Sequence, residues 1–435
     1  MNSKIKHKVD MTGDEFVEFC GELKKKKKFQ KSLPMFPTPV PKLPKDWVWS
    51  CLSKISERVS VGHVGPTSEF FSNESDGVPF IRSQDVRPGR LMLDGALYIV
   101  PSFHERLKKS QLKAGDVLIV RVGANRGDTC DVPQGIGKLN CANVVFARLI
   151  EPNRFVTYFF RSSFGREMLL SVTTGSAQGV INTQTVARLP LPVPPLVTQQ
   201  KIGAILSAYD ELIENNQRRI ALLEKMAEEI YREWFVRLRF PGYEKVKKVK
   251  GVPEGWDVKK LGSVLELCYG KALKDDDRVS GEFHVYGSSG VVGTHNEALV
   301  KTPGLIVGRK GNVGSVYWSD RGFFPIDTVY YVKSVLPNSF LYFLLRSMNF
   351  INNDAAVPGL NRNQAYSNLF FLPPAQLIKR YVEIADSLFK MKRVFTRKNE
   401  YLTSMRDKLL PRLISGKLSV EHLDIRFPPG MEDRS

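Results

Sequence analysis

Apolar residues recur every three or four positions along residues 199–239, and this spacing predicts a long amphipathic helix. The apolar positions are Leu206, Tyr209, Ile213, Ile220, Leu223, Ala227, Ile230 and Trp234. They form one seam of the heptad type, and charged side chains occupy the opposite side. About 40 residues rising 1.5 Å each make a rod of about 60 Å, which needs a partner helix of similar length to bury its seam.

A second stretch with the same spacing supplies that partner. Its apolar positions are Tyr381, Ile384, Leu388, Met391, Phe395, Leu402, Met405 and Leu409. A shift of 179 positions places Leu223 on Leu402 and Ile230 on Leu409. Two unrelated amphipathic helices on separate domains would give a similar spacing. The repeat continues outside both helices, however, so we predict that the two helices share one seam within a duplicated chain.

A block of short apolar runs precedes each long helix. In residues 44–195 glycine, proline and aspartate separate these runs, as expected for strands, and one helix is expected at 155–171. Residues 253–374 form the second block. Both blocks begin with the pattern Pro-x-x-Trp and end in a proline-rich segment. The order of runs predicts an α+β fold, and it excludes a doubly wound nucleotide-binding sheet.

Two motifs recur inside the blocks. Residues 305–314 correspond to residues 118–127, and residues 359–364 correspond to residues 179–184 with a shift of 180. Between these motifs the two blocks differ heavily. We therefore expect two domains that have the same frame and different contents, each followed by a long helix.

The pattern divides the chain into seven parts. They are a basic N-terminal extension (1–43), a first domain (44–195), a first long helix (196–240), a linker (241–252), a second domain (253–374), a second long helix (375–418) and a C-terminal tail (419–435). The extension contains an unbroken run of lysines at 24–28. Such a run either grips DNA phosphates or is simply solvated, so it receives no assigned role.

The charge of the chain indicates the class of its partner. The 435 residues carry a formal net charge of +19, which favours a polyanionic partner, nucleic acid before an anionic membrane. No apolar run of membrane-spanning length and no signal-type N-terminus occurs, so we expect a cytoplasmic protein. The five cysteines are scattered and no Cys-x-x-Cys occurs, which argues against disulfides and zinc.

Two glycine-containing loops that follow predicted strands carry residues suited to DNA. Glycine lets the backbone approach a phosphate, and arginine and asparagine pair with the edges of guanine and adenine. A pair of β-turns that simply need glycine is the plain alternative. The candidate DNA-binding residues are Arg82, Arg121, Asn125, Arg126, Arg309, Lys310, Asn312, Asn361 and Arg362. Gln184 and Gln364 are expected instead to cap the join between domain and helix.

Candidate catalytic residues are missing from the sequence. We find no adenosylmethionine-binding glycine motif, no Asn-Pro-Pro-Tyr-type methylation motif, no P-loop and no convincing nuclease pattern. Asp275–Asp277 resembles a metal cluster, but three adjacent acids in a loop are usually solvated. The pattern is typical of a protein that recognises DNA without modifying it.

Two variable domains with this arrangement resemble the specificity (S) subunits of type I restriction–modification systems. The similar stretches are Phe80–Val86, Val285–Gly290, Gly308–Gly311 and Leu409–Lys417, and the resemblance covers residues 44–420. It implies two target recognition domains, each reading one half of a bipartite site in double-stranded DNA. It also implies that the long helices form an antiparallel coiled coil, which sets the distance between the half-sites.

The resemblance further implies partner subunits. Two methyltransferase subunits would dock on the coiled coil, and restriction subunits with translocase activity would join them in host defence. S-adenosylmethionine, ATP and magnesium would belong to those partners, with no cofactor in this chain. Two other classes stay open: an enzyme with an attached methyltransferase or nuclease, and a DNA-binding regulator or coiled-coil scaffold outside restriction–modification.

Overall fold

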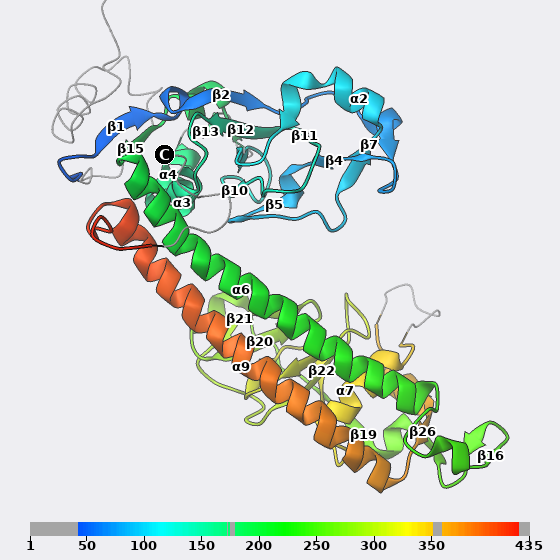
Figure 1. Ribbon diagram of the computed structural model, residues 1–435. Coiled ribbons are helices and arrows are strands. Elements are labelled where there is room, and N and C mark those ends of the chain that lie inside the picture. Colours follow the sequence, from blue (N-terminus) through cyan, green and yellow to red (C-terminus); the bar gives the residue numbers. More distant parts are fainter. Residues whose placement is uncertain (1–41, 172, 175–178, 351–358, 426–435) are drawn as a thin grey trace, which may run out of the picture. The chain divides into compact units, whose positions relative to one another are not determined.

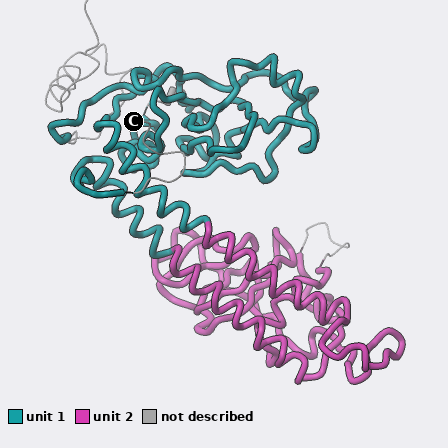
Figure 2. Tube along the Cα trace, viewed as in Figure 1, with its two compact units in different colours: residues 1–214, 400–435 teal, residues 215–399 magenta. Residues whose placement is uncertain are grey.

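The computed structural model describes residues 42–171, 173–174, 179–350 and 359–425 (Figure 1). The chain divides into two compact units (Figure 2). Unit 1 comprises Met1–Glu214 and Glu400–Ser435, and unit 2 comprises Asn215–Asn399. Each unit holds one mixed domain and a segment of both long helices. The lysine run at 24–28 lies outside the described residues.

The described residues of unit 1 form many short strands and, besides the long helices, four α-helices. The strands are β1 (Val48–Cys51), β2 (Ser56–Val61), β3 (Phe71–Ser72), β4 (Val78–Ile81), β5 (Val86–Arg87), β6 (Arg90–Leu91), β7 (Leu97–Ile99), β8 (Gln111–Leu112), β9 (Val117–Val120), β10 (Thr129–Asp131), β11 (Leu139–Cys141), β12 (Val144–Leu149), β13 (Thr173–Thr174), β14 (Val180–Ile181) and β15 (Pro190–Val193). The helices are α2 (Pro101–Arg106), α3 (Phe155–Arg161), α4 (Ser163–Ser171) and α5 (Thr183–Ala187). One helix was predicted at 155–171, but Ser162 adopts an extended conformation and divides it into α3 and α4.

The central strand of unit 1 is buried on both faces. The sheet has the order β10-β9-β12-β2, and all four residues of β9 are buried. Val117 and Ile119 face the core that contains α3, whereas Leu118 and Val120 face a second core on the other side. Successive side chains of a strand point to opposite faces, so a continuous apolar run is what a doubly covered strand requires.

Unit 2 repeats this frame. Its strands are β16 (Lys248–Val249), β17 (Val252–Pro253), β18 (Asp257–Lys260), β19 (Leu265–Tyr269), β20 (Phe283–Gly287), β21 (Gly290–His295), β22 (Gly304–Gly308), β23 (Val316–Ser319), β24 (Phe323–Pro325), β25 (Val329–Ser334) and β26 (Leu369–Leu372), with helices α7 (Asn338–Ser347) and α8 (Arg362–Ser367). The sheet order β23-β22-β25-β19 has the same connectivity as β10-β9-β12-β2. The strand that opens each domain pairs with the strand that closes it, β1 with β15 and β18 with β26. The predicted duplicated α+β fold is confirmed.

The long helices α6 (Leu196–Tyr231) and α9 (Ala375–Ile414) run antiparallel. In unit 2 the side chain of Asn216 donates to Asn399 over 2.8 Å, and Tyr381 donates to the carbonyl oxygen of Ala227 over 3.2 Å. In unit 1 Arg406 of α9 donates to Asp210, near the middle of α6. Residue numbers therefore rise along α6 while those of its partners fall along α9.

Both helices end earlier than predicted. The α-helical part of α6 stops at Tyr231 rather than near residue 240, and a π-helical turn follows at Arg232–Val236. Leu238 then adopts a left-handed φ of 58°, which a helix cannot contain. Helix α9 ends at Ile414 rather than at residue 418, because Gly416 turns left-handed with φ 69°.

The predicted seam is correct only in part. Leu223 and Ala227 of α6 are buried, as is Tyr381 of α9. Phe389 of α9 is buried too, although the predicted seam did not include it. Two predicted seam residues, Ile384 and Met391, are 40% and 48% exposed. Each domain also packs on the helices, so the buried side of α9 is rotated away from the face that a two-helix seam alone would use.

One carboxylate of α6 binds side chains from both neighbouring elements in unit 1. Tyr158 and Arg161 of α3 donate to Asp210 over 2.7 and 2.6 Å, and Arg406 of α9 donates over 2.6 Å. Burial opposes the ionisation of Asp210, but the hydrogen bonds and charges of these partners outweigh it and lower the pKa of the carboxyl.

Unit 2 contains a matching arrangement. Glu224 of α6 accepts hydrogen bonds from Tyr342 and Arg346 of α7 and from Lys392 of α9, over 2.7, 3.1 and 2.6 Å. Burial again opposes ionisation, and these three partners lower the pKa of Glu224. In each unit, therefore, one carboxylate joins the domain to both helices.

Replacing Asp210 with Asn should reduce the free energy of unfolding by about 3 kcal/mol, because two arginines lose their counter-charge in a largely buried site. The matched control is Asp407→Asn, which also removes a partner of Arg406. Asp407 is 56% exposed, whereas Asp210 is 17% exposed, so the control should cost less than about 1 kcal/mol. Urea denaturation of the full chain, followed by tryptophan fluorescence, measures both.

The same denaturation experiment can be repeated at different pH values. A carboxyl whose pKa is depressed on folding stabilises the protein above its unfolded pKa of about 4, and this contribution is lost as the pH falls through the folded pKa. Wild type should therefore lose more stability between pH 6 and pH 3 than an Asp210→Asn, Glu224→Gln variant does. Equal losses of stability in the two proteins would show that these carboxylates do not contribute to the pH dependence of folding.

Candidate nucleic-acid interface

The two glycine-containing loops leave the central strands at the same point in both units. In unit 1 the backbone amide of Val120 donates to the carbonyl oxygen of Asp128 over 2.9 Å, and the amide of Gly127 donates to the carbonyl oxygen of Val120 over 2.8 Å. In unit 2 the amide of Gly308 donates to Ser315 over 2.7 Å, and Gly314 donates to Gly308 over 2.9 Å. These bonds close the same kind of loop around different sequences.

The hydrogen bonds correct the alignment of the two loops. The ungapped sequence comparison placed Arg121 opposite Gly308. In the structure Arg121 and Arg309 are equivalent, because each is the first residue after its strand and the loop of unit 1 is one residue longer. The carbonyl of each arginine also accepts an equivalent bond, from Ile181 over 3.0 Å and from Leu360 over 2.8 Å.

The second repeated motif shifts as well. The side chain of Asn182 caps α5, and the side chain of Asn361 caps α8, each accepting two backbone N–H bonds. The shift between these motifs is therefore 179 rather than 180. The expectation that Gln184 and Gln364 act as caps is wrong, because the glutamines contribute only backbone N–H groups to these bonds. The short asparagine side chain reaches the first turn of a helix more readily.

The candidate arginines of unit 1 are bound within the protein. Arg121 donates to the side chain of Asn143 over 3.2 Å, and Arg126 donates to the carbonyl of Gly179 over 2.6 Å. Arg82 lies after β4, where its guanidinium binds the buried Asp85 over 3.2 and 3.3 Å. These bonds hold the loops in shape. Asn125 is partly exposed in the same loop as Arg126.

In unit 2 the structure brings two candidate arginines to one tyrosine. The guanidinium carbon of Arg309 lies 4.9 Å from the centre of the Tyr269 ring, and that of Arg362 lies 5.2 Å from it. Arg309 also lies 5.8 Å from the ring of Tyr330. Tyr269 is 50% exposed, so the group faces solvent. We call Tyr269, Arg309 and Arg362 the tyrosine–arginine cluster.

Hydrogen bonds fix this cluster in position. Arg309 donates to the carbonyl of Asp327 over 3.0 Å, and the hydroxyl of Tyr330 donates to the carbonyl of Leu360 over 3.1 Å. Burial and the neighbouring Tyr269 raise the pKa of Tyr330, which keeps the donating phenol protonated. Lys310 and Asn312, in the loop that begins at Arg309, are exposed.

Sequence reasoning missed Tyr269. It is the last residue of β19 and pairs with Tyr330 in the sheet. Its neighbours come from three distant parts of the chain, so no local pattern distinguishes it from other strand tyrosines. A half-exposed aromatic ring beside two guanidinium groups can contact a base or sugar while the cations contact phosphate or guanine.

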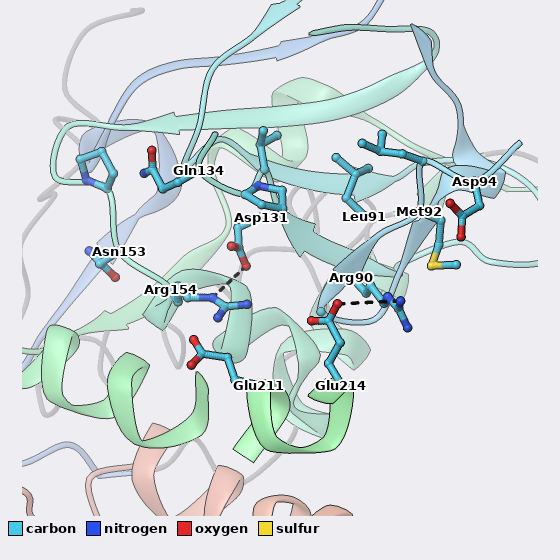
Figure 3. A pocket seen from close by; sticks show the side chains of 16 residues that line it. Arg90, Leu91, Met92, Asp94, Asp131, Gln134, Asn153, Arg154, Glu211 and Glu214 are labelled. Atoms are coloured by element: carbon cyan, nitrogen blue, oxygen red, sulfur yellow. Dashed lines mark hydrogen bonds and ion pairs between the residues drawn. The ribbon is translucent and has the colours of Figure 1, made fainter. Parts of the chain in front are cut away.

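Unit 1 also contains a cavity of about 500 Å³ beside α6 (Figure 3). Its charged lining residues are Arg90, Asp94, Asp131, Arg154, Glu211 and Glu214. Arg154 pairs with Asp131 over 3.2 Å, and Arg90 pairs with Glu214 over 3.9 Å. Four carboxylates face two arginines, so the cavity is unsuited to a phosphate backbone.

The described residues contain no group of three or more His, Cys, Asp or Glu side chains placed to hold a metal ion. None of the helices described is long and apolar enough to cross a membrane.

A sequence model of the family described as the type I restriction modification DNA specificity domain matches the chain twice, at residues 44–225 and 253–400. The chain belongs to this family. The two matches include both mixed domains and most of both long helices, so the internal repeat is a repeat of the family domain itself. The nine candidate DNA-binding residues lie within the matched ranges and stay predictions.

Similar proteins agree with this assignment. The chain is 25% identical over 309 residues to the type I restriction enzyme MjaIX specificity subunit of Methanocaldococcus jannaschii, covering 62% of this chain and 70% of that protein. It is 21% identical over 430 residues to the putative MjaX specificity subunit of the same organism, covering 88% and 96%. The crystal structure of a type I restriction–modification S subunit from M. genitalium shares the fold, with a TM-score of 0.54, 17% identity and coverage of 88% and 98%.

Replacing Tyr269 with Ala should weaken DNA binding by about 1–2 kcal/mol, or roughly five- to thirty-fold in Kd, because two arginines lose the ring that positions them. Tyr269→Phe is the matched control and should bind like wild type, since the ring face rather than the hydroxyl meets the guanidinium groups. Fluorescence anisotropy of the full chain with duplex DNA measures both. A Phe variant as weak as the Ala variant would contradict this role of the ring.

Proposed function

We propose that this chain is the non-catalytic DNA specificity subunit of a type I restriction–modification complex, with each domain reading one half of a bipartite site. The observation that carries the proposal is the shared position of Arg121 and Arg309 after the central strand of the two units. The frame is the same, but the surroundings differ: Asn143 binds Arg121, whereas Tyr269 and Asp327 contact Arg309. Two domains with the same backbone frame and different contact residues are suited to reading two different half-sequences.

The charge of the protein supports the same proposal. A net charge of +19 favours association with DNA phosphates, and the tyrosine–arginine cluster offers partly exposed cations beside a fixed ring. The competing functions, a regulator or a scaffold outside restriction–modification, would not call for a duplicated specificity domain. The family match at both blocks favours the specificity subunit over them.

We further propose that α6 and α9 set the separation of the half-sites. Helix α6 has 36 residues and α9 has 40, which correspond to about 54 and 60 Å. At 3.4 Å per base pair, such lengths give an outer limit of about 16–18 base pairs. The buried Asn216, paired with Asn399, supports a fixed register, because a polar pair in an apolar seam disfavours sliding.

Methyltransferase subunits are the proposed partners of the exposed helix faces. Leu222 and Met226 of α6 are exposed, as are Ile384 and Met391 of α9. Exposed apolar side chains on a helix pair suit a protein partner. Restriction subunits would join that core, and S-adenosylmethionine, ATP and magnesium would be bound by the partners.

The docking proposal predicts that a Met226→Glu, Met391→Glu variant loses co-purification with the methyltransferase subunit while keeping DNA binding. A charge on the apolar face would have to be desolvated in the complex. The control is Glu229→Gln, a change at a partly exposed residue of α6 outside this apolar set. Full co-purification of the double variant would remove these residues from the interface.

Substitutions in the two loops should affect separate half-sites. Arg309→Gln should relax the half-sequence read by the second domain, and Arg126→Gln the half read by the first. A lost bidentate guanine contact costs roughly 1–3 kcal/mol. Sequencing methylated adenines in cells that carry each variant with its methyltransferase subunits reads the motif. A change in both halves from either variant would refute the assignment of one domain to one half.

An insertion of four residues between Gln217 and Arg218 should lengthen the unspecified spacer by close to two base pairs. The insertion adds about 6 Å, and the helix can absorb it as a stutter. The half-sequences should stay the same. A second variant carries this insertion and also four added residues between Lys398 and Asn399. It lengthens both helices at the same level, because Asn216 pairs with Asn399.

The matched control inserts the same four residues between Asp276 and Asp277, in an exposed 3-10 turn of unit 2. It should leave the spacer unchanged. The methylated motif reports the spacing, and anisotropy confirms that each variant binds DNA. An active helix variant with the original spacing would show that these helices do not set the distance.

A further inference from the structure

A lysine-bearing hairpin follows the end of α6 in unit 2. Strands β16 and β17 pair antiparallel, with Lys248 opposite Pro253 and Val249 opposite Val252. The turn between them is Lys250–Gly251, and both residues have positive φ, 51° and 82°. Two left-handed residues are what a tight two-residue hairpin turn requires. We call residues 245–253 the lysine hairpin.

The lysine hairpin carries only positive charge. Lys245, Lys247, Lys248 and Lys250 are all exposed, and the segment 245–253 contains no acidic residue. Within the described part of the chain, these four ammonium groups form no ion pair and no side-chain hydrogen bond. Four like charges this close repel one another. The exposed Glu244 and Glu254 flank the segment, but neither forms an ion pair with these lysines. The arrangement therefore suits an external polyanion.

The base of the hairpin is fixed to the core of unit 2. Val246 and Val252 pack against that core. On either side of the hairpin, Phe240 and Trp256 are buried with their ring centres 5.3 Å apart. Figure 1 shows the hairpin, labelled β16, projecting from the body of unit 2. Its charges are therefore held on an anchored support, and less ordering entropy is lost on binding than for a free tail.

The side chains of the hairpin indicate which part of DNA it contacts. Residues 245–253 contain lysine, valine, glycine and proline only. Lysine is a compact point charge that binds phosphate, and the segment lacks the arginine, asparagine and glutamine that read base edges in pairs. Contacts of this kind add affinity without sequence preference.

We propose that the lysine hairpin binds the phosphate backbone of double-stranded DNA without reading its sequence. The proposal rests on the proposed function, since it presumes that the chain binds DNA. It adds a sequence-independent contact outside the two glycine-containing loops. The hairpin would supply non-specific affinity, while the loops choose the site.

The experiment compares wild type with a variant in which Lys245, Lys247, Lys248 and Lys250 are replaced by Gln. Binding of the full chain to a non-specific duplex is measured by fluorescence anisotropy between 50 and 200 mM salt. The slope of log K against log salt is negative, and each lost phosphate contact reduces its magnitude by about 0.9. The ratio of Kd at 200 mM to Kd at 50 mM should therefore fall about 3.5-fold for one contact and up to about 150-fold for four.

The control variant removes the same charge elsewhere. Lys379, Lys390, Lys408 and Lys417 are exposed residues on α9 or just after it, and all four become Gln. This variant should keep a slope close to that of wild type. An equal fall in both variants would overturn the proposal, because net charge alone would then explain it. An unchanged slope in the hairpin variant would overturn it as well.

Lysine acylation of wild type gives a second readout that needs no variant. Duplex DNA should protect the four hairpin lysines from an amine-reactive acylating reagent, and high salt should remove the protection. Equal labelling with and without DNA would overturn the proposal. With methyltransferase subunits present, the hairpin variant should keep the wild-type methylated motif. If wild type itself does not bind DNA, the proposed function fails, which is distinct from failure of the hairpin alone.

Discussion

A partly buried carboxylate joins each domain to the long helices. Asp210 in unit 1 and Glu224 in unit 2 each accept bonds from a tyrosine and an arginine of the domain and from a cation of α9. A charge removed from water must be compensated by several partners, so three elements have to meet at one point. This requirement fixes α3 or α7 against the helices, and the sheet of each domain packs on that helix in turn.

With the frame fixed in this way, the loops are free to differ. The strand order and the bonds that close the glycine-containing loops are the same in both units, whereas the residues around Arg121 and Arg309 are not. In unit 1 the arginines are bound by loop groups, and in unit 2 they flank an exposed ring. Recognition can diverge in such a fold because the loops contribute little to the packing that holds the domains together.

The structure also separates charge by location. The cavity beside α6 has four carboxylates and two arginines in its lining, whereas the tyrosine–arginine cluster and the lysine hairpin are cationic. The two signs of charge are thus separated between these sites. The cluster and the hairpin present positive charge that a phosphate backbone can reach, and α9 carries exposed lysines as well.

The sequence by itself determined the two long helices, the duplicated α+β frame and the family, because periodicity and repeated motifs are properties of the chain alone. It did not determine which face of α9 is buried: Ile384 and Met391 fit the heptad seam, yet they are exposed. It also misaligned the repeated loops by one residue and assigned the caps to Gln184 and Gln364. Only the tertiary structure decided these points, since packing of the domain and backbone hydrogen bonds select among neighbouring positions with equal local preference. The cluster around Tyr269 and the carboxylate of Asp210 depended on tertiary structure for the same reason, because their partners lie far apart in sequence and meet only in the folded chain.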